Sequence, residues 1–353
     1  MPVQVRPPAP FSIIPPRFGV DAMSTELVKK EIERFLASSA IEAICIRGKW
    51  GVGKTFTWMS YLAGAKAAGK IALGKYAYVS LFGLNSLEEV RYSIFENTIK
   101  RDAIGSSASF ETMAATIETF ARRNAKTLKI AATLIPFSGA KDVASQIFPY
   151  FLGIREQIIC IDDFERRGNN LAVGDILGLL SFLKEQRGCK IVLLLNDDAL
   201  DGDDKETFES YLDKVVDASL RFAPTPSEAV EIALNGTDYL STTTAERCAT
   251  LGISNIRAIR RIDRLVRSAV AILEGWQIDQ KVTAQCVQSV VLLAWYVFEP
   301  DIAPKLEYLS NRRKSYFGSR KDKDVTPEEA SWDALLEHDV TPVSHPAITR
   351  VCG

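Results

Sequence analysis

Histidine is nearly absent from this sequence, and its cysteines form no metal-binding pattern. The 353 residues include two histidines, His338 and His345, both near the C-terminus. They include six cysteines and no C-x-x-C pair. Histidine-based acid–base catalysis and a zinc site are therefore not expected in the main part of the chain. Cys45, Cys160 and Cys189 fall in or beside apolar stretches, where cysteine is usually a small buried hydrophobe, so we expect a reducing, cytoplasmic environment.

Strong net charge and long apolar runs are also lacking. The net charge is −1, so bulk electrostatics give no reason to expect nucleic acid or an anionic membrane as a partner. A transmembrane helix needs about 20 apolar residues in succession. The stretches 130–140, with 11 residues and a proline, and 290–298, with nine residues, are too short, so no transmembrane span is expected. The first 16 residues contain six prolines and predict an extended arm, not a secretory signal.

Residues 48–55 read GKWGVGKT and carry most of the functional information. G-x-x-x-x-G-K-T is the phosphate-binding P-loop, in which backbone N–H groups and a helix N-terminus converge on a phosphate chain. The strand and helix that must flank it are predicted at 41–46 and 54–68. Lys54 would reach the β- and γ-phosphates, and the Thr55 hydroxyl would bind Mg²⁺. The residues expected to contact the nucleotide are Gly48, Lys49, Trp50, Gly51, Val52, Gly53, Lys54, Thr55 and Phe56.

Two further apolar stretches end in polar residues. The stretch 157–161 is followed by Asp162 and Asp163, the arrangement of a Walker B motif. In such a motif the first carboxylate supports Mg²⁺, and the next one can orient the attacking water. The stretch 190–195 is followed by Asn196, which would lie beside the γ-phosphate if its strand neighbours the P-loop strand. A plain Asn-Asp turn is the alternative interpretation.

At residues 46–55, 161–166 and 191–196 the sequence resembles AAA+-type P-loop NTPases, and most closely the KAP group and its STAND relatives. The resemblance covers residues 20–270, approximately. It implies an ATP-binding and ATP-hydrolysing α/β domain of the ASCE type, with parallel strand order 5-1-4-3-2 and a C-terminal helical lid. It also implies that Asp162 supports Mg²⁺ together with Thr55, and that Asn196 acts as the sensor. Relatives more often have Leu-Asp after the acidic pair, where this chain has Phe164 and Glu165. The catalytic carboxylate therefore stays open between Asp163 and Glu165.

The predicted organisation has four parts. A proline-rich arm at 1–20 either packs near the adenine base or is a linker. An α/β domain at 21–224 contains strands at 76–82 and 218–223, helices at 86–100 and 204–216, and a helical insertion at 97–156. The insertion either packs on the main core, which we favour, or forms an interface. A helical lid at 225–300, beginning near Ser227 after Pro226, and a charged, partly irregular tail at 301–353 complete the chain.

The lid is expected to carry an arginine stripe. Ser254 or Asn255 would cap a helix on which Arg257 and three further arginines recur at helical spacing. The other three arginines are Arg260, Arg264 and Arg267. Arg257 fits the sensor-2 position of AAA+ lids. The stripe as a whole fits either a face that binds nucleic acid or a neighbouring subunit, or a solvated face balanced by acidic neighbours. A basic segment at 312–323, with two aromatic residues, fits either a solvated loop or a site for single-stranded nucleic acid.

These features predict a cytoplasmic, Mg²⁺-dependent ATPase that drives or times a conformational change or an assembly. A homo-oligomer or a partner protein is expected to complete the site with an arginine finger. Candidates for that finger are Arg166, Arg167, Arg221 and Lys214. Two alternatives stay open. One is a nucleotide-gated scaffold that binds ATP without turnover, as in STAND relatives, some of which act in antiviral defence. The other is an ATPase stimulated by nucleic acid, which the net charge does not indicate.

Overall fold

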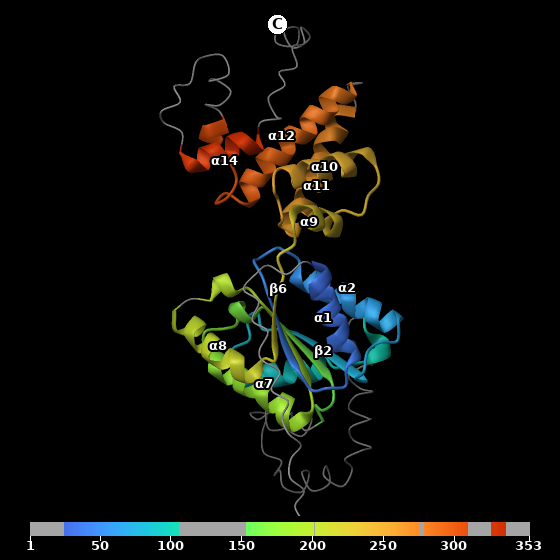
Figure 1. Cartoon of the computed structure of the whole chain (residues 1–353), viewed down its shortest axis with the longest axis vertical. Coiled ribbons are helices and arrows are strands. Elements are labelled where there is room, and N and C mark those ends of the chain that lie inside the picture. The colour runs from blue at the N-terminus through green and yellow to red at the C-terminus, as the bar shows by residue number, and fades with distance from the viewer. Residues whose placement is uncertain (1–24, 106–152, 201, 275–278, 310–325, 337–353) are drawn as a thin grey trace, which may run out of the picture. The chain divides into compact units, whose positions relative to one another are not determined.

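The computed structural model describes residues 25–105, 153–200, 202–274, 279–309 and 326–336. Contacts divide the chain into two units, Met1–Lys49 with Lys54–Ala223, and Trp50–Gly53 with Pro224–Gly353. Each unit is described by itself (Figure 1). The predicted arm at 1–20, most of the insertion at 97–156 and the basic segment at 312–323 lie outside the described residues.

The first unit is built on a six-stranded sheet of order β3-β2-β4-β5-β1-β6. All strands are parallel except β3, which runs antiparallel to β2 at the sheet edge. When β3 is left out and the five parallel strands are numbered 1 to 5 along the chain, their order from β6 to β2 is 5-1-4-3-2. This order confirms the predicted fold class. The strands are β1 (Ala43–Arg47), β2 (Lys75–Ser80), β3 (Ile99–Lys100), β4 (Ile158–Asp162), β5 (Lys190–Leu195) and β6 (Ala218–Arg221).

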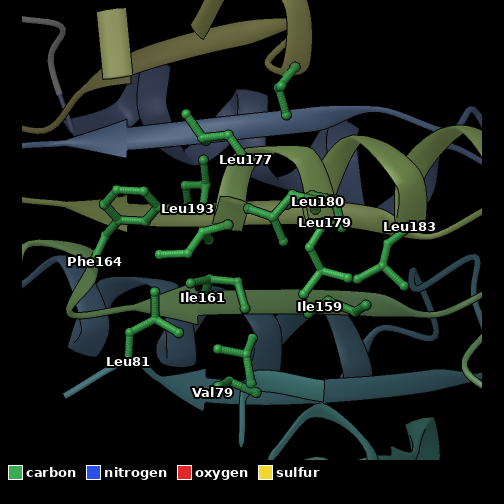
Figure 2. Packing of buried hydrophobic residues seen from close by; sticks show 14 of the residues in the cluster. Val79, Leu81, Ile159, Ile161, Phe164, Leu177, Leu179, Leu180, Leu183 and Leu193 are labelled. Carbon is green, nitrogen blue, oxygen red and sulfur yellow. The ribbon is translucent and has the colours of Figure 1, made fainter. Parts of the chain in front are cut away.

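Helices cover both faces of this sheet. On one face lie α1 (Thr25–Ala37) and α2 (Lys54–Ala67), the blue helices of Figure 1. On the other face α3 (Leu87–Glu96), α7 (Val173–Arg187) and α8 (Gly202–Val215) share one buried apolar cluster with the strands. Figure 2 shows Leu177 and Leu180 of α7 packed over Ile161 and Leu193. Parallel strands covered on both faces are apolar throughout, which explains the uninterrupted hydrophobic runs in the sequence.

The helix predicted at 86–100 is wrong in its last four residues, because α3 ends at Glu96. Ser86 is its N-cap and accepts a hydrogen bond from the Glu89 N–H at 3.2 Å. At the other end the Asn97 amide and the Thr98 hydroxyl donate to carbonyls of the last turn. Ile99 then pairs with Tyr76 as part of β3, so burial at the sheet edge overrides helix propensity there.

The second unit is helical, as predicted for a lid. The Thr225 hydroxyl and Glu228 form a capping box around Pro226, the first residue of α9. Asn255, not Ser254, caps α11, because its Oδ1 accepts from the Ala258 N–H at 3.1 Å. The helices are α9 (Pro226–Ala233), α10 (Tyr239–Thr250), α11 (Ile256–Glu274), α12 (Gln280–Phe298) and α14 (Pro327–Leu335).

Two parts of this unit extend the expectations from sequence. Within the charged C-terminal segment, α14 buries Trp332, whose ring centroid lies 5.0 Å from that of Tyr308. Among the described helices, α12 alone is long and apolar enough to cross a membrane by length and composition. One such helix is weak evidence for a span; within this unit 22% of its apolar window is buried, including Val287, Val291 and Trp295.

A buried lysine joins α1 to the start of β5. The Lys190 ammonium is fully buried and donates to the Phe35 and Ser38 carbonyls at the C-terminal end of α1, the second at 2.6 Å. It also lies 4.2 Å from the centroid of the Phe35 ring. Helix C-termini carry unpaired carbonyls and partial negative charge, so a cation there is favourable. Burial nevertheless lowers the pKa of Lys190 from 10.5 to about 8.

We predict that Lys190→Met lowers the free energy of unfolding by about 1–3 kcal/mol, because two buried carbonyls lose their donor. Folded Lys190 loses its proton near pH 8 and unfolded lysine near pH 10.5, so the unfolded state binds more protons between these values. The stability of the parent protein relative to Lys190→Met should therefore rise across this window, as measured by chemical denaturation. The exposed Lys205→Met is the control. A difference that stays constant from pH 8 to pH 10.5 would contradict the assignment.

Candidate nucleotide-binding site

The P-loop has the backbone geometry that its glycines predict. Gly51 and Gly53 have φ values of 82° and 91°, in a region that L-residues with a Cβ rarely adopt. The Gly48 N–H donates to the Leu195 carbonyl at 3.1 Å, which ties the start of the loop to the end of β5. Val52 is buried, whereas Trp50 and Phe56 are exposed. The loop thus joins β1 to α2 as the motif requires.

Lys54 is the first residue of α2 and is buried within the P-loop. Its Nζ donates to the Gly48 carbonyl at 2.6 Å and to the Lys49 carbonyl at 3.1 Å. A lysine held across the loop in this way is a compact positive charge at a helix N-terminus. The predicted phosphate-binding lysine therefore lies inside the loop that it is expected to serve.

Thr55 and Asp162, the two predicted Mg²⁺ ligands, are in direct contact. The Thr55 hydroxyl donates to Asp162 Oδ2 at 2.6 Å, and Asp162 is 6% exposed. Asp162 Oδ2 also accepts from the Tyr78 hydroxyl at 2.8 Å, and its Oδ1 accepts from the Asp163 N–H at 2.8 Å. Sequence reasoning missed Tyr78. Its signal was the alternation of hydroxyl and apolar residues at 76–81, which puts the hydroxyls on one face of the strand.

Asp163 and Glu165, the two candidates for the catalytic carboxylate, have different surroundings. Asp163 has φ 53°, an uncommon conformation for a residue other than glycine. Its Oδ2 accepts from the Ser80 hydroxyl at 2.6 Å, and its Oδ1 pairs with the Arg166 guanidinium at 3.3 Å. Both oxygens of Asp163 are therefore engaged by neighbouring side chains.

Glu165 instead faces the end of β5. The Asn196 N–H donates to Glu165 Oε2 at 3.3 Å. Burial raises the pKa of Glu165, and the charges of Lys54 and Asp163 act on it in opposite directions. Glu165 thus lies within electrostatic reach of the P-loop lysine.

Asn196 lies at the predicted strand tip, since β5 pairs with β1 on one side and β4 on the other. Its side chain is 7% exposed, and none of the described residues donates a hydrogen bond to its buried Oδ1. Buried polar atoms are nearly always satisfied, so this oxygen is available to accept from a water molecule or another bound donor. This observation favours a functional Asn196 over a plain turn.

Phe164 anchors the turn between the two candidate carboxylates. Its ring is fully buried in the apolar cluster of Figure 2 and meets the Phe208 ring edge-on, with centroids 5.4 Å apart. The buried ring therefore fixes the position of the turn that carries Asp163 and Glu165.

The turn after Phe164 is also tied to the loop after β2. The Gly83 N–H donates to the Arg166 carbonyl at 3.4 Å, and the Gly168 N–H donates to the Leu84 carbonyl at 2.7 Å. The Arg166 guanidinium lies 3.9 Å from the centroid of the Phe82 ring, which is 62% exposed. The acidic loop and the loop after β2 are therefore bonded together at several points.

The arginine-finger candidates differ in how they are engaged. Arg166 contacts Asp163 and Phe82, and Arg167 pairs with Asp204 and donates to the Leu171 carbonyl. Both are thus used within the chain. Lys214 lies 5.3 Å from the Tyr211 ring centroid. Arg221 is exposed at the end of β6.

The predicted arginine stripe of α11 is partly engaged within the second unit. Arg260 donates to the Ala233 and Ile232 carbonyls at the end of α9. Arg267 pairs with Asp238 and Asp263, each at 3.0 Å. These contacts agree with the interpretation of a face balanced by neighbouring groups, and they leave fewer cations for nucleic acid. Arg257 is exposed. Its guanidinium lies 5.7 Å from the ring centroid of Trp50, a residue of the same unit. Its sensor role stays a prediction.

The donor set fits a magnesium–nucleotide complex. Within the described residues no three His, Cys, Asp or Glu side chains are grouped to hold a metal by themselves. Mg²⁺ is typically bound by one or two protein oxygen ligands together with substrate phosphates and water. The hydroxyl of Thr55 and the carboxylate of Asp162, beside the P-loop, are such ligands. The unpartnered Asn196 oxygen adds a polar group for the phosphate or the water.

Comparisons with known proteins place the chain among P-loop proteins. No curated protein matches significantly. RuvB of Thermotoga maritima aligns at 13% identity over 90% of this chain and 85% of that chain, with a TM-score of 0.40. Drosophila ORC bound to DNA aligns at 12% identity over 92% of this chain and 75% of that chain, with a TM-score of 0.44. The Aeropyrum pernix Orc1 protein in complex with DNA aligns at 14% identity over 92% of this chain and 80% of that chain, with a TM-score of 0.40. Likenesses at these values carry no argument about function. Residues 27–269, more than half of the chain, match the KAP family P-loop domain. The chain therefore belongs to the KAP family of P-loop NTPases, and nucleotide binding at this site follows from that membership.

Proposed function

We propose that the protein is a cytoplasmic, Mg²⁺-dependent ATPase whose turnover drives or times a conformational change or an assembly. The observation that carries this proposal is the buried, unpartnered Oδ1 of Asn196, a residue whose backbone N–H donates to the Glu165 carboxylate. Both residues follow neighbouring parallel strands, β4 and β5, and the P-loop follows β1 on the other side of β5. In parallel sheets the carboxyl ends of strands form the ligand-binding edge.

The P-loop residues would bind and polarise the phosphate chain. Loop N–H groups and the N-terminus of α2 favour negative charge. Lys54 would exchange its bonds to the Gly48 and Lys49 carbonyls for phosphate oxygens. When bound, Mg²⁺ neutralises charge on the β- and γ-phosphates. Thr55 and Asp162 would hold it, because they are adjacent oxygen donors at this end of the loop.

Glu165 is the better candidate for the residue that orients the attacking water. Asp163 uses one oxygen to accept from Ser80 and the other to pair with Arg166, so neighbouring side chains already orient both of its oxygens. Among the described residues, the Glu165 carboxylate accepts from backbone N–H groups, its own and that of Asn196, the latter at 3.3 Å. Partial burial also makes Glu165 more basic, as suits a general base. Asp163 then serves to hold the turn in its uncommon backbone conformation.

A neighbouring subunit would complete the site. Arg166 and Arg167 are engaged within the chain, so Arg221, exposed at the end of β6, is the stronger candidate for a finger supplied to another copy. A charge provided in trans would stabilise the transferring phosphoryl group and make turnover depend on assembly.

Lys54→Ala should lower phosphate release from Mg²⁺–ATP by about 100-fold or more, because a preorganised charge at the phosphates is lost. Lys70→Ala, an exposed lysine beyond the other end of α2, is the matched control and should keep full activity. The parent protein should show turnover that rises more than linearly with protein concentration. An unchanged rate in Lys54→Ala would refute the ATPase assignment. Nucleotide binding without turnover would favour the nucleotide-gated scaffold.

Glu165→Gln should retain ATP binding and lose about 100- to 10,000-fold in phosphate release, the usual contribution of general acid–base catalysis. Asp163→Asn should lose less activity and lower the melting temperature, because its ion pair with Arg166 supports the turn. The two variants differ in charge from the parent by the same amount, so each controls for the other. A larger loss in Asp163→Asn than in Glu165→Gln would assign the catalytic role to Asp163.

The single-turnover rate should fall as pH decreases through the pKa of Glu165, because the base must be ionised. Burial raises this pKa above the ordinary value of 4.5, so the acid limb should lie above pH 4.5. The limb should be absent from the residual rate of Glu165→Gln. A limb at or below pH 4.5, or the same limb in both proteins, would contradict the role assigned to Glu165.

A further inference from the structure

Tyr78 lies on the strand next to the acidic motif, in a register that brings its hydroxyl to Asp162. Parallel pairing sets Tyr78 opposite Cys160 and Ser80 opposite Asp162. Ala77 and Val79 fill the apolar cluster on one face of the sheet, so Tyr78 points to the opposite face. The Tyr78 hydroxyl donates to Asp162 Oδ2 at 2.8 Å.

Among the described residues, the groups that donate hydrogen bonds to Asp162 are neutral. They are the hydroxyls of Thr55 and Tyr78 and the N–H of Asp163. Within the described residues no cation pairs with this carboxylate, which suits it to bind a metal cation. Thr55 is itself an expected ligand, and the Asp163 N–H belongs to a backbone in an uncommon conformation. Of these three donors, the Tyr78 hydroxyl is the one to which no other role at the site is assigned.

The position of the Tyr78 hydroxyl is set by the sheet. The Tyr78 ring is attached to β2, whose pairing with β4 fixes the distance between the two side chains. Groups that hold a metal-binding carboxylate in place commonly set metal affinity as strongly as some ligands do.

We propose that Tyr78 is a positioning residue that holds the Asp162 carboxylate in the orientation needed to bind the divalent cation of a metal–nucleotide complex. This inference rests on the proposed function for the identity of the bound complex, but it does not require hydrolysis. Tyr78 would contact neither the nucleotide nor the P-loop, so removing its hydroxyl should affect metal binding alone.

The test measures Mn²⁺ binding to the full-length protein by electron paramagnetic resonance, in the presence of ADP. Tyr78→Phe should weaken Mn²⁺ binding by about tenfold. ADP binding in EDTA, where no metal is available, should match the parent. Asp162→Asn should abolish Mn²⁺ binding and thereby identify the site that is being measured.

Tyr76→Phe is the matched control. Tyr76 lies two residues away on the same face of β2, but its hydroxyl accepts from the Trp58 indole N–H at 2.9 Å and donates to Met59 Sδ at 3.8 Å, not to Asp162. Its loss should lower the melting temperature and leave Mn²⁺ affinity unchanged. The proposal is overturned if Tyr78→Phe binds Mn²⁺ as tightly as the parent, if ADP binding in EDTA falls equally, or if Tyr76→Phe weakens Mn²⁺ to the same degree. A parent that binds Mn²⁺ and ADP without hydrolysing ATP would refute the proposed turnover alone; a parent that binds no Mn²⁺ would overturn this proposal as well.

Discussion

The candidate site depends on the position of β5 between β1 and β4. All six residues of β5 are buried, and its parallel register sets Leu194 beside Ile46 and Leu193 beside Ile161. Because these three strands run in the same direction, the P-loop, the acidic motif and Asn196 leave the sheet at the same edge. A slip of one residue would exchange the faces of the strand and move Lys190 away from the carbonyls at the end of α1. The apolar core and the polar site are therefore fixed by one register.

The parts of this arrangement that follow from local sequence could be predicted. The P-loop needs glycine at positions 51 and 53, because the backbone conformations there are ones that other residues avoid. The motif can therefore be recognised from the amino-acid sequence. The strands are buried on both faces and stand out as apolar runs, and polar residues at their ends mark the binding edge. Thr225 and Pro226 likewise predict the start of α9, because threonine is favoured at the N-cap and proline at the first position of a helix.

Other parts depend on contacts between distant segments. Asp163 and Glu165 differ in their hydrogen-bond partners because Asp163 adopts φ 53° and accepts from Ser80, 83 positions earlier in the chain. No local sequence pattern predicts this contact. Tyr78 approaches Asp162 only because β2 pairs with β4 in one register. The same reason explains why residues 99–100 form an edge strand and not the end of a helix. The buried Trp332 of α14 was similarly hidden in a charged segment whose few apolar residues show no long periodicity.

The bonds between the acidic loop and the loop after β2 have a mechanical consequence. Glu165 sits in a turn whose flanking residues are bonded to Gly83 and Leu84, and Arg166 covers the exposed Phe82 ring. The two loops therefore move together or lose several hydrogen bonds at once. A displacement of Glu165 would therefore also move the exposed ring of Phe82, so a change at the end of β4 would alter the surface of the protein.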